Sequence, residues 1–385
     1  MGPTKTAIVV GGGTMGLASA WALARAGVQV TVLERFGHVH ERGSHGGFTR
    51  IIRQAYHEGE NYVPLVQRAD ALWCELAARS GRALLDRTGM LEFGPPGDHE
   101  LLASIDACER HGVDHQRFDA DLLMRRWPFV VPAHWHGCFT PSGGQLHVQA
   151  CLDALRDEAM TAGAALHYDA VVREISRGDR CGVVLDDGRR VHADRVVVTA
   201  GAWLPQLLPQ LLPERLTPLR RVLTWWRPAP EHRDALTRLP VWGAFDPRGF
   251  FYGFPYADAG IAGVKIACHV ARGDDHRAAE PGVDPDHVDR ALHEQDLAPL
   301  RQFIDEHFPC AGGELVDHRV CLYTATPSWD FVIDRDPEDA RVIVAGGCSG
   351  HGFKFAPAVG ELVARLVQDD GSAPPQQFCR ARHMG

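Results

Sequence analysis

The sequence feature that most constrains the fold is a glycine-rich turn close to the N-terminus. Gly11, Gly13 and Gly16 fit the pattern GxGxxG, which follows the apolar run TAIVV and opens the helix-like segment LASAWALARAG. The alternating run VQVTVLE completes a βαβ unit, in which such glycines allow a tight turn and the close approach of a pyrophosphate. Glu34 ends the second strand, 18 residues after Gly16, where a carboxylate accepts hydrogen bonds from ribose hydroxyls. The pattern predicts a dinucleotide site; the alternative is a glycine-rich turn without a ligand.

Two later segments extend this unit. One begins with LHVQACLDALRDEAM, a helical pattern closed by Gly163, and reaches the apolar run VVVTAGAW at residues 196–203. That run resembles the second conserved element of FAD-binding folds of the glutathione reductase type, which favours FAD over NAD and places Gly201 and Trp203 near the cofactor. The C-terminal stretch RVIVAGGCSGHGFKF again predicts a strand followed by a glycine-rich turn.

Aromatic and proline-rich segments such as VLTWWRPAP and GFFYGFPY separate these parts and indicate another sheet. At 385 residues the chain exceeds the size at which single cores stop growing. We therefore expect an α/β protein, with a Rossmann-like FAD-binding domain of glutathione reductase type interleaved with an α+β substrate domain that has a large mixed β-sheet. The expected FAD-binding domain comprises residues 1–85, 145–215 and 318–385, and the substrate domain comprises residues 86–144 and 216–317.

Composition excludes several classes of function. The net charge is −9 and no Lys/Arg-rich run is present, so nucleic acid is not an expected partner. No apolar run approaches the length of a membrane span and the N-terminus lacks a signal peptide, so we expect a cytoplasmic protein without membrane contact. The ten cysteines form no CxxC pair or zinc-finger spacing, which indicates reduced core thiols and no metal.

Three motifs resemble one known family. GSHGGFTRIIRQAYHEGENYVPL begins at residue 43, and CLYTATPSWDFVID and SGHGFKFAPAVGE follow near the C-terminus. They are similar to the family of monomeric sarcosine oxidase and N-methyltryptophan oxidase, and nearly the whole chain follows its order of elements. The resemblance implies a monomer that oxidises a secondary amino acid with FAD and reduces O₂ to H₂O₂. It also implies that FAD is attached covalently, through its 8α carbon, to Cys321.

The same resemblance assigns roles to charged residues. Arg53 and Lys354 bind the substrate carboxylate, as a guanidinium fork and an ammonium do well in a dry site. The alternative for Arg53 is a surface ion pair. Arg50 lies near the flavin face, or else it pairs with a carboxylate such as Glu41.

Lys265 is informative without any family, because in AGVKIACH it interrupts an apolar strand and shares one face with His269. A charged group there needs a partner, unless the strand lies at a sheet edge. The family reading makes Lys265 the group that activates O₂ and places His269 on the substrate side. Tyr252 matches an active-site tyrosine, although it could instead be an aromatic core residue.

The resemblance implies further cofactor contacts, and His351 among them could otherwise be only a loop-packing residue. These contacts are Thr14, Met15, Arg35, Ser44, Thr49, Gly350, His351, Gly352 and Phe353.

The sequence departs from the family at several positions. Gly46, Phe48 and Ser328 replace residues near the flavin, which affects how flavin attachment is assisted. Gly243 falls where the sarcosine enzyme has a bulky methionine, so we expect a larger substrate pocket.

Four alternatives for the function stay open. The substrate is a larger N-methyl amino acid or a cyclic imino acid such as proline or pipecolate; the enzyme is a dehydrogenase that passes electrons to a carrier; or the chain is a flavin-binding relative without activity.

Overall fold

A six-stranded sheet forms the first of two main layers. The computed structural model describes residues 5–212, 215–258, 260–271, 280–368 and 373–384. The strand order is β19-β20-β13-β1-β2-β9, parallel except for the antiparallel pair β19–β20. The strands are β1 (Thr6–Val10), β2 (Gln29–Leu33), β9 (Ala165–His167), β13 (Arg195–Val198), β19 (Val332–Arg335) and β20 (Val342–Gly346). The central strands read as nearly continuous apolar runs because both faces of this sheet are buried, one under helices and the other under a small sheet and the segment 204–212.

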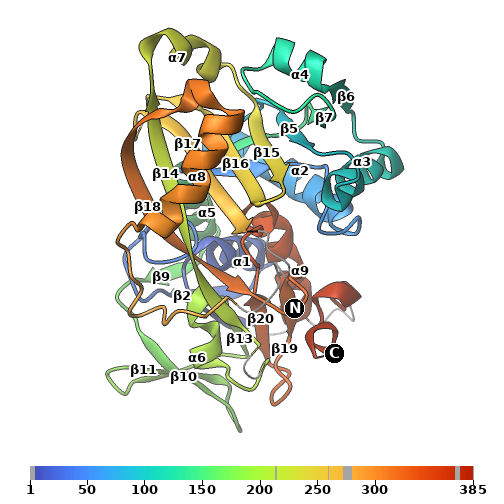
Figure 1. The fold of residues 1–385 in the computed structure, drawn as a ribbon. Coiled ribbons are helices and arrows are strands. Elements are labelled where there is room, and N and C mark those ends of the chain that lie inside the picture. Colours follow the sequence, from blue (N-terminus) through green and yellow to red (C-terminus); the bar gives the residue numbers. More distant parts are fainter. Residues whose placement is uncertain (1–4, 213–214, 259, 272–279, 369–372, 385) are drawn as a thin grey trace.

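An eight-stranded sheet forms the second main layer, in the order β18-β14-β17-β16-β15-β5-β7-β6. Its pairs are antiparallel except for β15–β5, so the sheet is mixed. The strands are β5 (Met90–Gly94), β6 (Gln116–Asp119), β7 (His136–Thr140), β14 (Thr217–Pro228), β15 (Val241–Asp246), β16 (Gly249–Ala257), β17 (Gly263–Ala271) and β18 (Gly313–Ala325). In Figure 1 this sheet occupies the upper half of the molecule and the six-stranded sheet the lower half.

Two small sheets complete the strand pairing. One contains β3 (Thr49–Ile52), β8 (Gly144–His147) and β4 (Leu85–Asp86), and the other contains β10 (Val172–Ser176), β11 (Gly182–Leu185) and β12 (Arg190–His192).

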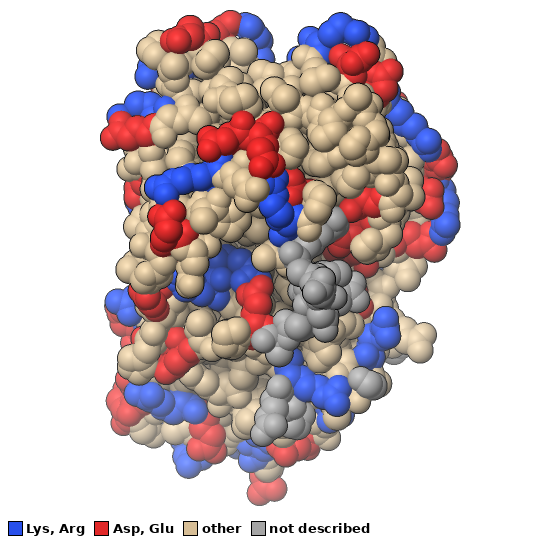
Figure 2. Space-filling view, in the orientation of Figure 1, with Lys and Arg blue, Asp and Glu red and all other residues tan. Residues whose placement is uncertain are grey.

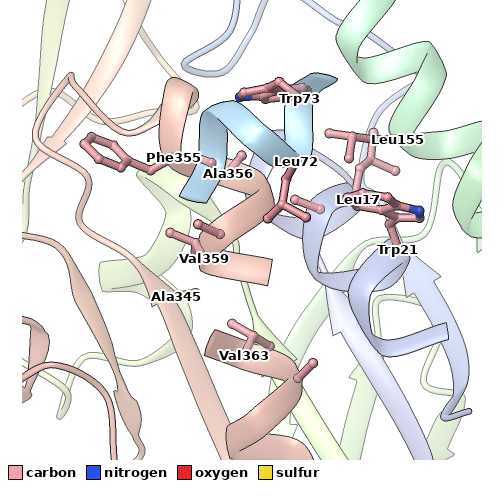
Figure 3. Packing of buried hydrophobic residues seen from close by; sticks show 14 of the residues in the cluster. Leu17, Trp21, Leu72, Trp73, Leu155, Ala345, Phe355, Ala356, Val359 and Val363 are labelled. Atoms are coloured by element: carbon pink, nitrogen blue, oxygen red, sulfur yellow. The ribbon is translucent and has the colours of Figure 1, made fainter. Parts of the chain in front are cut away.

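Helices pack against both main sheets. Longer helices are α1 (Thr14–Arg25), α2 (Tyr62–Ser80), α3 (His99–His111), α5 (Val148–Thr161), α8 (Glu294–His307) and α9 (Ala356–Gln368), and shorter ones are α4 (Ala120–Arg126), α6 (Leu204–Leu207) and α7 (Pro230–Thr237). Figure 3 shows the buried cluster formed where α1, α2, α5 and α9 meet, with Trp21 and Trp73 among its largest side chains. Burying such aromatic side chains is worth about 1.5–3 kcal/mol each, which fixes α1 and its glycine turn on the sheet.

The expected fold class, α/β with a large mixed sheet, is confirmed. The two main sheets alternate along the chain in the interleaved order of the domains expected from the sequence, and β18 crosses the expected boundary at residues 317 and 318. We keep that division as a proposal. Acidic and basic side chains are interspersed over the face shown in Figure 2. None of the helices in the described ranges combines the length and the apolar character needed to span a bilayer.

Candidate active site

The glycine turn has the geometry that a pyrophosphate requires. Gly11 has φ +100°, and a Cβ there would lie 2.7 Å from the carbonyl oxygen of Thr199. A Cβ at Gly16 would lie 1.8 Å from the carbonyl oxygen of Gly11, so no larger residue fits the first turn of α1. Both positions therefore need glycine for backbone packing, which leaves the N-terminus of α1 open to a ligand.

Glu34 lies at the same end of the sheet and is buried. Its Oε2 accepts a hydrogen bond from the backbone N–H of Gly12 at 2.6 Å, and its Oε1 accepts one from Phe36 at 2.8 Å. A carboxylate has about four acceptor sites, so two remain for ribose hydroxyls. Arg35 is already engaged in an ion pair with Asp286 at 2.6 Å.

A cavity of about 400 Å³ runs from this turn to the large sheet. Every residue named above for the cofactor or the substrate lines it, except Gly16 and Gly243. Gly16 contributes instead by allowing the close packing of the first turn of α1 against Gly11. One cavity therefore joins the nucleotide end to Lys265, Lys354 and Cys321.

His45 also lines this cavity and was missed by sequence reasoning. Its ring is buried, and its Nε2 has no hydrogen-bond partner in the part of the chain that the structure describes. Burial, and the neighbouring His40, lower the pKa of His45 to about 3, so the ring is neutral. A neutral imidazole with an orphaned nitrogen beside Gly13 suits a polar ligand, which agrees with FAD in this cavity. Its place in the sequence, two residues after an arginine–glycine pair, matches no motif that would indicate a ligand-binding histidine.

Lys265 projects from β17 into the cavity. Its Nζ donates to the carbonyl oxygens of Gly47 and Thr49, each at 2.9 Å, and no carboxylate among the described residues forms an ion pair with it. Burial and the Arg50 charge hold the pKa of Lys265 well below its usual value. Because β17 lies between β14 and β16, the edge-strand explanation is wrong. The partner expected for this buried amino group is therefore a pair of backbone carbonyl oxygens.

His269 lies on the same strand at an irregularity in the pairing with β16, where Phe250 pairs with Val270 and Phe251 with Cys268. Its Nδ1 is 2.9 Å from the hydroxyl of Tyr323. Burial holds the pKa of His269 well below its usual value, so the ring is neutral. Tyr323 lines the cavity beside Tyr252 and was also missed, because nothing in CLYTATP distinguishes its hydroxyl from that of a core tyrosine.

Arg53 is buried, so the surface ion pair considered from the sequence is wrong. Its Nη2 donates to both carboxylate oxygens of Glu58 at 2.6 Å, and its Nη1 lies 3.8 Å from Glu92. Burial alone raises the pKa of Glu58, but the neighbouring positive groups, of which the Arg53 guanidinium has the largest effect, together outweigh burial and hold that pKa well below its usual value. Arg53 therefore already has a carboxylate partner in the structure.

Lys354 has no such partner among the described residues. It lies in the 3-10 turn η3 (Phe353–Phe355), and its Nζ donates to the carbonyl oxygen of His351 at 2.8 Å and to the hydroxyl of Tyr56 at 3.3 Å. Burial and the Arg53 charge lower the pKa of Lys354 to about 7. An ammonium that lacks a carboxylate in a buried cavity stabilises an anionic ligand.

Arg50 does not pair with Glu41, which instead binds Arg319 at 3.1 Å. The Arg50 guanidinium donates to the carbonyl oxygens of Ser44, Gly46 and Thr49. It thereby stabilises the loop that also binds Lys265, and within the described ranges no carboxylate forms an ion pair with it at the cavity wall.

Three departures from the family lie off the cavity. Phe48 is exposed with φ +65°, Gly46 is buried behind the cavity wall, and Ser328 bonds His383. Cys321 lies on β18 in the cavity wall, and Cys348, which was expected to be a core thiol, lines the cavity as well.

The expectation that Gly243 enlarges the substrate pocket is wrong. A Cβ on Gly243 would lie 2.5 Å from the Phe250 ring and 3.3 Å from Met90. Phe250 and Met90 both line the cavity, so the ring of Phe250 fills the space that Gly243 leaves. The sequence of one strand could not show that Phe250 fills this space, because the contact depends on the pairing of β15 with β16.

Comparison with known proteins agrees with this geometry. A family model described as FAD dependent oxidoreductase matches residues 6–366. Monomeric sarcosine oxidase from Bacillus sp. (strain B-0618) is 35% identical over 365 residues, which cover 94% of this chain and 91% of that protein. N-methyl-L-tryptophan oxidase from Yersinia pestis (strain Pestoides F) is 34% identical over 374 residues, 95% of each chain. The open form of NikD, an amino acid oxidase essential for nikkomycin biosynthesis, is 25% identical, with a TM-score of 0.82 and 98% of both chains covered.

Proposed function

Because this chain belongs to the FAD dependent oxidoreductase family, we propose that it oxidises a secondary amino acid to an imine and reduces O₂ to H₂O₂. The observation that carries the proposal is the single cavity that joins the glycine turn to two buried amino groups, Lys265 and Lys354. Neither amino group forms an ion pair with a described carboxylate. The names of the two curated relatives, a sarcosine oxidase and an N-methyltryptophan oxidase, support the substrate class.

The residues at the nucleotide end fit FAD. The N-terminus of α1 and its glycine turn hold the pyrophosphate, Glu34 holds the ribose, and His45 and Arg50 hold polar groups farther along the cavity. Bound FAD supplies the acceptor for a hydride from the carbon next to the amine nitrogen. We further propose that Cys321 attaches the cofactor as a thioether; its place in the cavity wall supports this.

Lys354 and Arg53 position the substrate by its carboxylate. Lys354 needs no rearrangement, since no described carboxylate neutralises it, whereas Arg53 must first release Glu58. Two cations beside the substrate also disfavour a positive charge on its amine, so they favour the neutral amine that oxidation requires. His269 and Tyr323 add a neutral hydrogen-bonded pair to the same cavity.

Lys265 acts on oxygen in this proposal. Its amino group is preorganised by two carbonyl oxygens and is separate from the pair formed by Arg53 and Glu58. When this amino group carries a proton, its charge, fixed in a dry cavity, stabilises the negative charge that develops on O₂ without reorganisation of the site. We also propose a cytoplasmic monomer, as the name of the sarcosine relative suggests for the oligomeric state.

A steady-state assay tests the function. The purified holoenzyme is supplied in air with a panel of N-methyl and cyclic amino acids, and H₂O₂ is measured. Peroxide in a 1:1 ratio with substrate consumed is the expected result. Turnover only with an added electron carrier would instead establish the dehydrogenase alternative. A cyclic imino acid with the highest kcat/KM would establish the proline or pipecolate type.

A further inference from the structure

The C-terminal segment is packed into the main core rather than lying on the surface. Residues 373–384 follow α9 and contact β19, and Figure 1 shows the C-terminus beside that strand. Phe378 is fully buried, with its ring 5.4 Å from that of Phe331 and nearly parallel to it. The backbone N–H of Arg380 donates to Asp334 at 2.8 Å. The segment lies beyond residue 366, where the family match ends.

His383 attaches this segment to the loop after β18. The His383 ring is 1% exposed, with Nε2 3.1 Å from the carbonyl oxygen of Phe331 and Nδ1 3.0 Å from Oγ of Ser328. A carbonyl only accepts hydrogen bonds, so Nε2 carries the proton and Nδ1 accepts from the Ser328 hydroxyl. Burial lowers the pKa of His383, so the neutral ring binds both ends of the segment Ser328–Phe331 in one fixed tautomer.

The middle of the same loop contacts the active site. The carbonyl oxygen of Trp329 accepts a hydrogen bond from Nε2 of His351 at 3.0 Å. That bond leaves Nδ1 of His351 to accept from the hydroxyl of Tyr56, at 2.6 Å. The Tyr56 oxygen in turn accepts from Nζ of Lys354, which also donates to the carbonyl oxygen of His351.

Trp329 has φ +63°, a backbone conformation that costs a bulky residue energy and that persists only where its surroundings impose it. His383 and the ring of Phe378 supply contacts on one side of this loop, and His351 supplies them on the other. Each hydrogen bond in this series has one fixed donor and one fixed acceptor, so no group can exchange its partner for the next. A shift of the loop therefore displaces His351 and, through it, Lys354.

We infer that the C-terminal segment is a positioning element of the active site, in which His383 fixes the loop 328–331 and thereby the ammonium of Lys354 that binds the substrate carboxylate. The inference rests on the proposed function, since it deepens the role given there to Lys354. His383 touches neither the substrate nor the cofactor in this account. It acts only through Ser328, Trp329 and His351.

The test is the affinity of the FAD-loaded enzyme for propionate, measured from the change in the visible flavin spectrum. His383→Ala should weaken propionate binding by about 10-fold, because Lys354 loses its fixed position, while flavin content stays at the wild-type level. With substrate, KM should rise and kcat at saturation should change little. His383→Gln keeps a donor for Phe331 and an acceptor for Ser328, so it should restore affinity.

Met384→Ala, an exposed neighbour in the same segment, is the matched control and should bind propionate like the wild type. Ser328→Ala removes the bond to Nδ1 of His383, together with the one that Oγ accepts from the backbone N–H of Asp330 within the same loop, and it serves if His383→Ala does not fold. A folded, flavin-loaded His383→Ala or Ser328→Ala with wild-type affinity overturns the inference.

Lys354→Met separates this inference from the proposed function. If Lys354→Met weakens propionate binding and the His383 and Ser328 variants do not, the positioning role alone is wrong. If Lys354→Met leaves the affinity unchanged, the carboxylate site of the proposed function is wrong.

Discussion

Glu58→Gln tests whether the substrate carboxylate must compete for Arg53. In the structure the guanidinium donates to both oxygens of Glu58 at 2.6 Å, so a ligand carboxylate that binds Arg53 has to replace this pair. A charge-assisted hydrogen bond is worth about 1.5–3 kcal/mol, and glutamine keeps a neutral acceptor in place of the charge. Removing the competitor should tighten propionate binding by roughly 10- to 150-fold, since about 1.36 kcal/mol is a factor of ten. Glu92, 3.8 Å from Arg53, partly replaces the lost charge and favours the lower figure.

The assay is a spectral titration of the holoenzyme with propionate at about pH 6. Burial lowers the pKa of Lys354 to about 7, so its amino group is charged at pH 6 and becomes neutral as the pH rises above 7. Propionate affinity in wild type and variant should therefore fall as the pH rises through 7. Glu60→Gln is the matched control, because Glu60 lies two residues after Glu58 and forms an exposed ion pair with Arg110. Unchanged affinity in a folded Glu58→Gln protein would refute a role for Arg53 in carboxylate binding.

Three other predictions test separate parts of the site. Acid precipitation should give a yellow pellet from the wild type and a colourless one from Cys321→Ser. Cys348→Ser, which changes the second thiol in the cavity, should still give a yellow pellet. A colourless wild-type pellet rules out the covalent bond. Lys265→Met should slow reoxidation in air by about 10²- to 10³-fold while anaerobic reduction by substrate persists, and stopped-flow traces that show equal loss of both steps exclude the oxygen role. Phe250→Ala should shift kcat/KM toward bulkier amino acids by about 1–3 kcal/mol, and Gly243→Ala, which displaces the Phe250 ring, should shift it toward smaller ones; an unchanged order across the substrate panel contradicts this.

Several features of the site follow from short stretches of sequence. Gly11 and Gly16 contact each other within one turn, so the motif alone specifies the nucleotide end of the fold. The placement of Lys265 and His269 on one cavity wall follows from the two-residue period of a strand. The motifs near the C-terminus led to Cys321 and Lys354, both of which line the same cavity.

Other features depend on which distant segments meet. The interruption of an apolar strand by Lys265 was evident, but only the position of β17 inside the large sheet excluded an edge strand. Gly243 suggested an open pocket, and only the pairing of β15 with β16 brought Phe250 into that space. The neutral hydrogen-bonded pair of His269 and Tyr323 likewise joins two different strands.

The sequence by itself thus determined the βαβ unit, the fold class and several of the glycines and charged residues that line the cavity, because each depends on local backbone geometry or on a short motif. The tertiary structure decided which charges are neutralised. Arg53 and Glu58 are near neighbours in sequence, yet only burial makes their pair strong, and Lys354 is left without a described carboxylate because of its place in the fold. Burial and long-range pairing set the dielectric environment and the partner of every charge, and neither is a property of a local pattern.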